Sequence, residues 1–255
     1  MVLSHLKRDE IIDKHSPIPM YYQIMNQLRE KIAEGVYNVG DALPPERELV
    51  EIYQVSRMTI RQAILELVNE GILVRRKGIG TFVASPKIEQ ALNSLTSFTQ
   101  DMAQRGMQAG GRVLSFKETT PDPTIRKTLG LSAQDKVFEC VRLRLADEEP
   151  MALETTTLVA SICPGLQRED LEHQSLYKIL AERWNIQLDY ATQSLEPIVA
   201  PPYEANLLHV APGSPLLLMY RVTYDQSDRA FEHVKSLYRG DRYKFVTELH
   251  YKPGR

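Results

Sequence analysis

The 255-residue chain has few cysteines, almost no net charge and no long apolar run. Cys140 and Cys163 have no Cys or His nearby at metal-ligand spacing, so we expect two reduced thiols and no metal site. No apolar run approaches the ~18 residues of a membrane span, and the polar N-terminus lacks the apolar core of a signal peptide. These absences disfavour secretion and membrane insertion and predict a cytoplasmic protein with no membrane partner.

The net charge of −2 excludes any argument from overall basicity, so a nucleic-acid site has to be local. The segment 57–87 has such a local excess of positive charge. It holds Arg57, Arg61, Arg75, Arg76, Lys77 and Lys87 against only Glu66 and Glu70. A basic face of this kind can attract a polyanion even on a neutral protein.

Helices are predicted over 20–34, 44–53 and 57–70, where apolar residues recur at helical spacing. We expect Pro45 in the first turn of the second helix, because proline has no N–H to leave unpaired there. Ser56 is a good N-cap for the third helix. Two short helices joined by a tight turn are typical of a helix-turn-helix.

A basic hairpin follows, with a strand from Leu73, a turn at 77–80 and a returning strand at 81–83. Gly78 and Gly80 allow positive φ and a close approach of the backbone to a partner. The order of helices and hairpin predicts a winged helix-turn-helix, a device for reading DNA.

The first turns of a recognition helix face the base edges in the major groove. Arg57 and Arg61 are the predicted base-contacting pair, because arginine commonly bonds guanine through two hydrogen bonds. Further predicted DNA contacts are Arg47, Ser56, Thr59, Gln62, Lys77, Gly78, Gly80 and Thr81. The alternative is an ordinary solvated helix face. The cap, the helix spacing and the basic wing all coincide within one segment, which favours DNA binding.

The rest of the chain alternates strands and helices and predicts an α+β fold. Strands are expected at 113–118, 136–146, 151–159, 188–198, 216–224, 230–238 and 243–249, and helices at 97–105, 124–129, 168–171, 175–184 and 203–208. Successive hairpins imply a mainly antiparallel sheet with one face covered by helices. The predicted domains are 16–84 and 93–252, with a linker at 85–92.

Alternation along the strand at 136–146 puts Arg142 and Arg144 on one face. Two adjacent guanidinium groups suit a phosphate or a carboxylate. For such a pair the commoner alternative is an exposed edge strand paired with carboxylates. Thr96, Ser97 and Phe98 open one helix, and Ser175 and Tyr177 open another, where hydroxyls and free N–H groups suit an anion. Glu154, Glu232 and Tyr238 suit sugar hydroxyls.

The stretch from residue 17 through residue 83 looks like the DNA-binding domain of the GntR family of bacterial repressors. The segments 95–102, 141–146, 150–154 and 231–243 resemble the UTRA effector domain of its HutC subfamily, whose fold is similar to chorismate lyase.

This resemblance implies a homodimeric repressor on a pseudo-palindromic operator in double-stranded DNA. Within the subfamily the resemblance is to repressors of amino-sugar (N-acetylglucosamine) catabolism. It therefore implies glucosamine-6-phosphate or N-acetylglucosamine-6-phosphate as effector. By the same resemblance, the serine and threonine step, the two arginines and Ser175 with Tyr177 hold the phosphate. The glutamates and Tyr238 face the sugar.

Three alternatives stay open: a repressor that senses another small anion, a lyase-like enzyme, and an architectural DNA-binding protein whose second domain only dimerises. Catalysis requires an activated nucleophile or an acid–base pair. The histidines considered for such a role are His173, His209, His233 and His250, and they stand in unrelated contexts. We expect neither a catalytic residue nor a cofactor.

Overall fold

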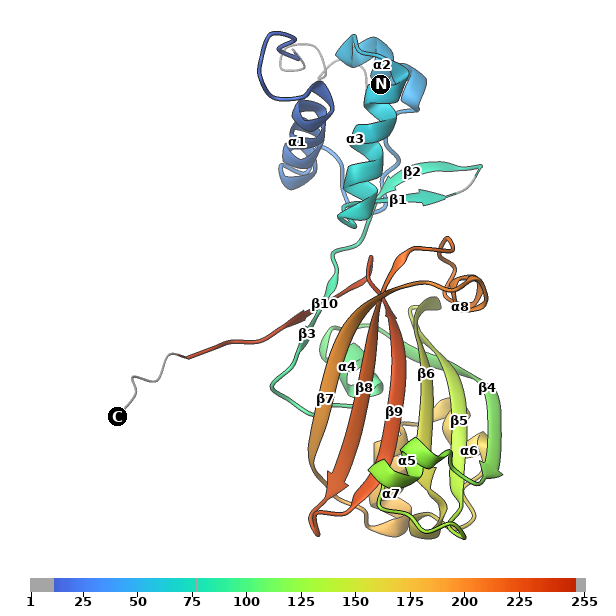
Figure 1. Ribbon diagram of the computed structural model, residues 1–255. Helices are drawn as coiled ribbons and strands as arrows, with labels where there is room; N and C mark the ends of the chain where they lie inside the picture. Colours follow the sequence, from blue (N-terminus) through green and yellow to red (C-terminus); the bar gives the residue numbers. More distant parts are fainter. Residues whose placement is uncertain (1–11, 77, 251–255) are drawn as a thin grey trace. The chain divides into compact units, whose positions relative to one another are not determined.

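The computed structural model describes residues 12–76 and 78–250 and divides the chain into two compact units between residues 88 and 89 (Figure 1). Unit 1 contains three helices and a hairpin. Its elements are α1 Met20–Ala33, α2 Glu46–Tyr53, α3 Arg57–Asn69, β1 Leu73–Arg76 and β2 Gly80–Val83. The two strands pair antiparallel, which confirms the predicted winged helix-turn-helix order.

The predicted N-cap of α3 is confirmed, because the Ser56 hydroxyl accepts a hydrogen bond from the Thr59 N–H at 3.2 Å. The expected place of Pro45 is wrong by one residue. Pro45 has an extended ψ of 149° and is itself the N-cap of α2, so the helix begins at Glu46. The core of unit 1 is apolar and draws on all three helices. It includes Ile24, Leu28, Leu49, Ile60, Ile64 and Leu67.

Unit 2 is built on one six-stranded sheet of order β4-β5-β6-β9-β8-β7, in which all neighbours are antiparallel. The strands are β4 Ala109–Thr119, β5 Val137–Ala146, β6 Glu149–Val159, β7 Leu188–Val199, β8 Pro215–Asp225 and β9 Ala230–Arg239. Asp147 and Glu148, both at positive φ, close the tight β5–β6 hairpin. The predicted antiparallel sheet is therefore confirmed.

The expectation that helices cover one face of the sheet is wrong, because both faces carry them. Helices α4, α6 and α7 lie on one face, and α5 and α8 lie on the other (Figure 1). Leu143, Leu153 and Leu237 pack with Ala205 of α8, so the strands are apolar on this second face as well. The helices are α4 Phe98–Gln104, α5 Pro123–Thr128, α6 Arg168–His173, α7 Leu176–Trp184 and α8 Pro202–Leu207, with a 3₁₀ turn at Ala160–Ile162.

The predicted linker at 85–92 contains a short strand, β3 Ile88–Ala91, in its second half. This strand pairs with β10, Tyr243–Val246, in a separate two-stranded ribbon. A run of four residues is too short to show the two-residue period of a strand in the sequence. Only the fold shows that Ile88 and Gln90 are buried and that Glu89 between them is exposed. The Glu89 carboxylate lies 2.6 Å from the Lys244 ammonium of β10.

Within the described residues, no helix combines the length and the apolar character that crossing a bilayer requires. In the same part of the chain, no group of three His, Cys, Asp or Glu side chains is arranged to hold a metal ion.

Candidate functional site

The N-terminal turns of α3 present the predicted DNA-contacting side chains to solvent. The side chains of Arg57 and Arg61 are 73% and 53% exposed, respectively. Gln62, one residue further on, and Arg47 on α2 are also exposed. Among the described residues of unit 1, none covers these side chains.

Glu46, at the start of α2, gathers three arginines around one carboxylate. Its oxygens lie 3.2 Å from Arg57 Nε, 3.0 Å from Arg75 Nη2 and 3.9 Å from Arg61 Nε. This carboxylate therefore holds together side chains from α3 and β1, and so preorganises a cationic surface.

Two predicted DNA contacts already have partners within unit 1. The hydroxyls of Ser56 and Thr59 share a hydrogen bond of 2.8 Å, and Ser56 also caps α3.

In the wing, Gly78 and Gly80 are exposed with φ of 76° and 153°, and Thr81 is half-buried. The predicted contact Lys77 lies outside the described residues.

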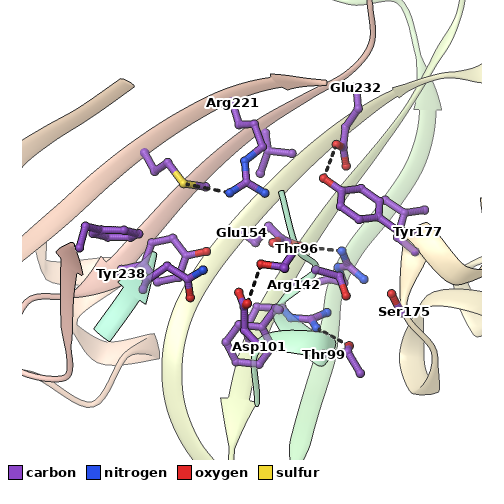
Figure 2. Close-up of a pocket in the computed structure, with 18 residues that line it drawn as sticks. Thr96, Thr99, Asp101, Arg142, Glu154, Ser175, Tyr177, Arg221, Glu232 and Tyr238 are labelled. Carbon is purple, nitrogen blue, oxygen red and sulfur yellow. Dashed lines mark hydrogen bonds and ion pairs between the residues drawn. The ribbon is translucent and has the colours of Figure 1, made fainter. Parts of the chain in front are cut away.

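Unit 2 contains a partly enclosed pocket that is lined mainly by polar and charged side chains. Its floor is one face of β5, β6, β9 and β8, and its walls come from α4, α7 and the β3–β10 ribbon. All ten predicted effector-binding residues line it: Thr96, Ser97, Phe98, Arg142, Arg144, Glu154, Ser175, Tyr177, Glu232 and Tyr238. Figure 2 shows Arg221 and Glu232 on one side of the pocket and Thr99 and Asp101 on the other.

Arg142 and Arg144 lie side by side on β5, an interior strand, so the exposed-edge alternative is wrong. Arg142 is buried and its Nη2 donates to Glu154 Oε1 at 2.5 Å. Burial is the largest single influence on both groups and opposes their charged forms, but their mutual attraction, their hydrogen bond and further neighbouring charges together outweigh it. The pKa of Glu154 is therefore lowered and that of Arg142 raised.

Arg144 is as deeply buried, with 6% of its surface exposed, but forms no ion pair within the described residues. Its Nη2 makes a long contact of 3.4 Å with the Thr99 hydroxyl, and its guanidinium lies 4.6 Å from the centre of the Phe98 ring. The buried Nε has no partner in the described residues. Burial, together with the neighbouring charge of Arg142, lowers the pKa of Arg144 to about 10, although the charge of Glu154 opposes this shift. The two guanidinium groups thus share the charge of one carboxylate, which is paired with Arg142.

The hydroxyls at the start of α4 are engaged within the protein. Thr96 donates to Asp101 Oδ1 at 2.6 Å, and Ser97 forms a capping box with Gln100. A ligand at this helix start would therefore meet the first N–H groups of α4 more readily than these hydroxyls. Ser175 differs, because its side chain makes no cap hydrogen bond at the start of α7.

Glu232 is fully enclosed at another part of the floor. Its Oε2 accepts from Tyr177 at 2.9 Å and from Thr223 at 2.6 Å. Burial raises the pKa of this carboxyl, opposed by the two hydroxyl donors. Burial also raises the pKa of Tyr177, which keeps its proton for the hydrogen bond.

The pocket includes residues that the sequence pattern missed. Arg221 on β8 donates from Nε and Nη2 to Gln193 Oε1 at 2.9 and 2.7 Å. It is the single charged residue between Leu216 and Tyr224, a signal that alternation along the strand contained. Further lining residues without such a signal are Gln90, Asp101 and Phe245.

The pocket combines charged groups and hydroxyls and contains no recognisable catalytic set. His233 lies on the opposite face of β9 from Glu232, with its ring 6.0 Å from that of Tyr220. Among the residues that line the pocket, none is a histidine or a cysteine. The arrangement is that of a binding site for an anion with polar groups attached.

Comparison with known proteins agrees with both units. Residues 20–83 match the bacterial regulatory proteins of the gntR family, and residues 104–244 match the UTRA domain. The chain belongs to the GntR family, as a member with a UTRA domain. It is therefore a transcriptional repressor of the GntR type, which binds DNA through unit 1 and a small-molecule effector through its UTRA domain, and not an enzyme.

Relatives extend the match over nearly the whole chain. The HTH-type transcriptional repressor NagR of Bacillus subtilis is 46% identical over 236 residues, covering 92% of this chain and 96% of NagR. The repressor PhnF of Mycolicibacterium smegmatis is 35% identical over 93% of this chain and 96% of its own. The crystal structure of PhnF from Mycobacterium smegmatis superposes with a TM-score of 0.63, covering 90% of this chain and all of that one.

The two buried glutamates predict opposite pH effects on stability. Glu232 has a raised pKa, so wild type loses stability relative to Glu232→Gln as the pH rises above the ordinary value of 4.5. Glu154 has a lowered pKa, so the stability that it contributes is present above 4.5 and lost as the pH falls through the folded-state pKa. Glu154→Gln should therefore lower the free energy of unfolding by about 3–5 kcal/mol at neutral pH, because it leaves Arg142 buried without its carboxylate partner. The loss should be smaller in acid.

Thermal unfolding of the two full-length variants across the acid-to-neutral range measures this contrast. Each variant is the control for the other, because both remove one carboxylate from the same pocket. Parallel pH profiles for the two variants would contradict the assigned charges.

Proposed function

We propose that this GntR repressor controls amino-sugar catabolic genes and releases its operator on binding glucosamine-6-phosphate or N-acetylglucosamine-6-phosphate. The observation that carries the proposal is the buried guanidinium of Arg144, which forms no ion pair of its own among the described residues and lies in a pocket that also presents hydroxyls and carboxylates. Sequence similarity to amino-sugar repressors supports the choice of sugar.

The charges around the arginine pair favour a phosphate. Glu154 neutralises Arg142, but Arg144 has no counter-ion, and two nitrogens of Arg142 are buried without a partner. A phosphate brings close to two negative charges at neutral pH and several acceptor oxygens. It satisfies donors on both guanidinium groups at once, whereas a neutral sugar supplies no charge.

The remaining polar groups favour a sugar at the other part of the ligand. Glu154, Glu232 and Tyr238 face the same space as the arginines. Carboxylates accept and tyrosine hydroxyls donate hydrogen bonds, which is the complement that sugar hydroxyls require. Phosphate binding then supplies most of the affinity, and these groups orient the ring.

Release of DNA follows if the effector binds one arrangement of the repressor better than another. In a homodimer on a pseudo-palindromic operator, two recognition helices must fit two half-sites at once. The sugar phosphate favours an arrangement that does not fit the operator only if it binds that arrangement more tightly. The size of the shift is set by this difference in affinity.

Replacing Arg61 with alanine should weaken operator binding by on the order of tenfold to a hundredfold, because it removes an arginine that contacts bases. Effector binding should not change. Arg29→Ala is the matched control: it removes one exposed positive charge from the same unit, but Arg29 pairs with Glu70, beyond the far end of α3. Fluorescence anisotropy with operator DNA measures both variants, and equal losses for the two would contradict the proposed contact.

Replacing Arg144 with alanine should leave operator binding intact and abolish release by either sugar phosphate. Arg112→Ala, which removes an exposed arginine of β4 in the same unit, should respond as wild type. Anisotropy of the operator complex titrated with each sugar phosphate measures the release. A normal response of Arg144→Ala would place the phosphate elsewhere. A wild type that ignores both sugar phosphates but responds to another anion would favour a repressor with a different effector.

A further inference from the structure

The side chain of Gln90 is a polar group in the pocket wall. The residue is 8% exposed, lies on β3 and lines the pocket. Within residues 12–76 and 78–250, no hydrogen bond to its carboxamide is present, and neither polar atom of the carboxamide is completely shielded from solvent. The carboxamide therefore keeps its hydrogen-bonding capacity free toward the open space that it lines, where a ligand can use it.

Gln90 lies at the end of the pocket away from the arginine pair. Gln90 and Arg221 also line a groove next to the pocket, together with Gln193 of β7, whereas Arg142 and Arg144 do not. Arg221 is on β8, three strands from β5 in the sheet. Three strand spacings amount to about 14 Å between backbones, and the side chains reach inward from both ends. A ligand with its phosphate on Arg144 therefore presents its other end to Gln90.

The ribbon that carries Gln90 is fastened to the elements around the pocket. Arg105, at the end of α4, donates to the Asp101 carbonyl at 2.5 Å and to the Glu89 carbonyl of β3 at 2.6 Å. On β10, the Phe245 ring packs edge-on against Tyr238 of the floor, with centroids 5.5 Å apart. β3 is thus a bonded wall of the pocket and a direct continuation of the chain from unit 1, since only residues 84–87 separate it from the wing strand β2.

We propose that Gln90 binds the sugar end of the effector and so brings ligand contact onto β3, the strand through which the chain enters the UTRA domain. The proposal rests on the proposed sugar-phosphate effector. A carboxamide both donates and accepts, which suits a ring hydroxyl as well as an acetamide. β3 is then part of what the ligand orders, and the boundary between the two units, between residues 88 and 89, lies within this strand.

The test compares full-length Gln90→Ala with Glu89→Gln, an exposed neighbour on the same strand, by calorimetric titration. The probes are inorganic phosphate, which reaches only the arginine end, and the two sugar phosphates. Gln90→Ala should bind a sugar phosphate about tenfold more weakly, the loss of roughly one hydrogen bond, and inorganic phosphate as wild type does. The effector concentration that releases the operator should rise by the same factor. Glu89→Gln should match wild type in all respects.

Sugar-phosphate binding by Gln90→Ala equal to wild type would overturn the inference and leave the proposed function standing. An equal loss for inorganic phosphate would also overturn it, because the substitution would then disturb the whole pocket. Wild type that binds inorganic phosphate but neither sugar phosphate would refute the proposed function, and this inference with it. If thermal unfolding shows that the alanine variant is not folded, Gln90→Met gives the same test at similar volume without the amide.

Discussion

A guanidinium buried without a counter-ion is unfavourable for folding, because its charge loses hydration and gains no partner. Arg144 is held in that position by β5, an interior strand whose other face packs into the apolar core around α8. A shift of one residue in register would move both arginines into that core. Hydrogen bonding along the strand and burial of its second face therefore keep Arg144 facing the pocket. In the proposed function, the free energy that its burial costs is returned when the phosphate of the effector binds.

Carboxylates organise arginines in both units, with different results. In unit 1, Glu46 holds Arg57, Arg61 and Arg75 near a solvent-exposed surface, where contact energies are small and the gain is orientation. In unit 2, Glu154 neutralises Arg142 and leaves Arg144 uncompensated. The first arrangement suits a long polyanion, because the arginines lie on an open surface. The second arrangement suits a compact anion, because the ligand has to enter an enclosed site.

Much of the fold and of the candidate site could be predicted from the sequence, because helix caps and strand alternation depend on residues that are close together in the chain. Ser56 caps α3 as predicted, and alternation put Arg142 and Arg144 on one face of β5. What could not be predicted depends on pairing between distant segments. Strand β3 is formed by its pairing with β10, more than 150 residues later in the chain, so Gln90 looked like part of a polar linker. The helices on the second face of the sheet could likewise not be predicted, because their presence there depends on where the chain places α8 against the sheet.

The central claim is that the pocket recognises a phosphate through Arg144. It is tested most directly by titrating the operator-bound, full-length protein with N-acetylglucosamine-6-phosphate and, in parallel, with N-acetylglucosamine. The two ligands share the sugar and differ only in the phosphate. The account predicts that the phosphorylated sugar dissociates the complex and that the neutral sugar does not, at any concentration up to a hundredfold excess over the effective dose. Release by both sugars at similar concentrations would contradict it.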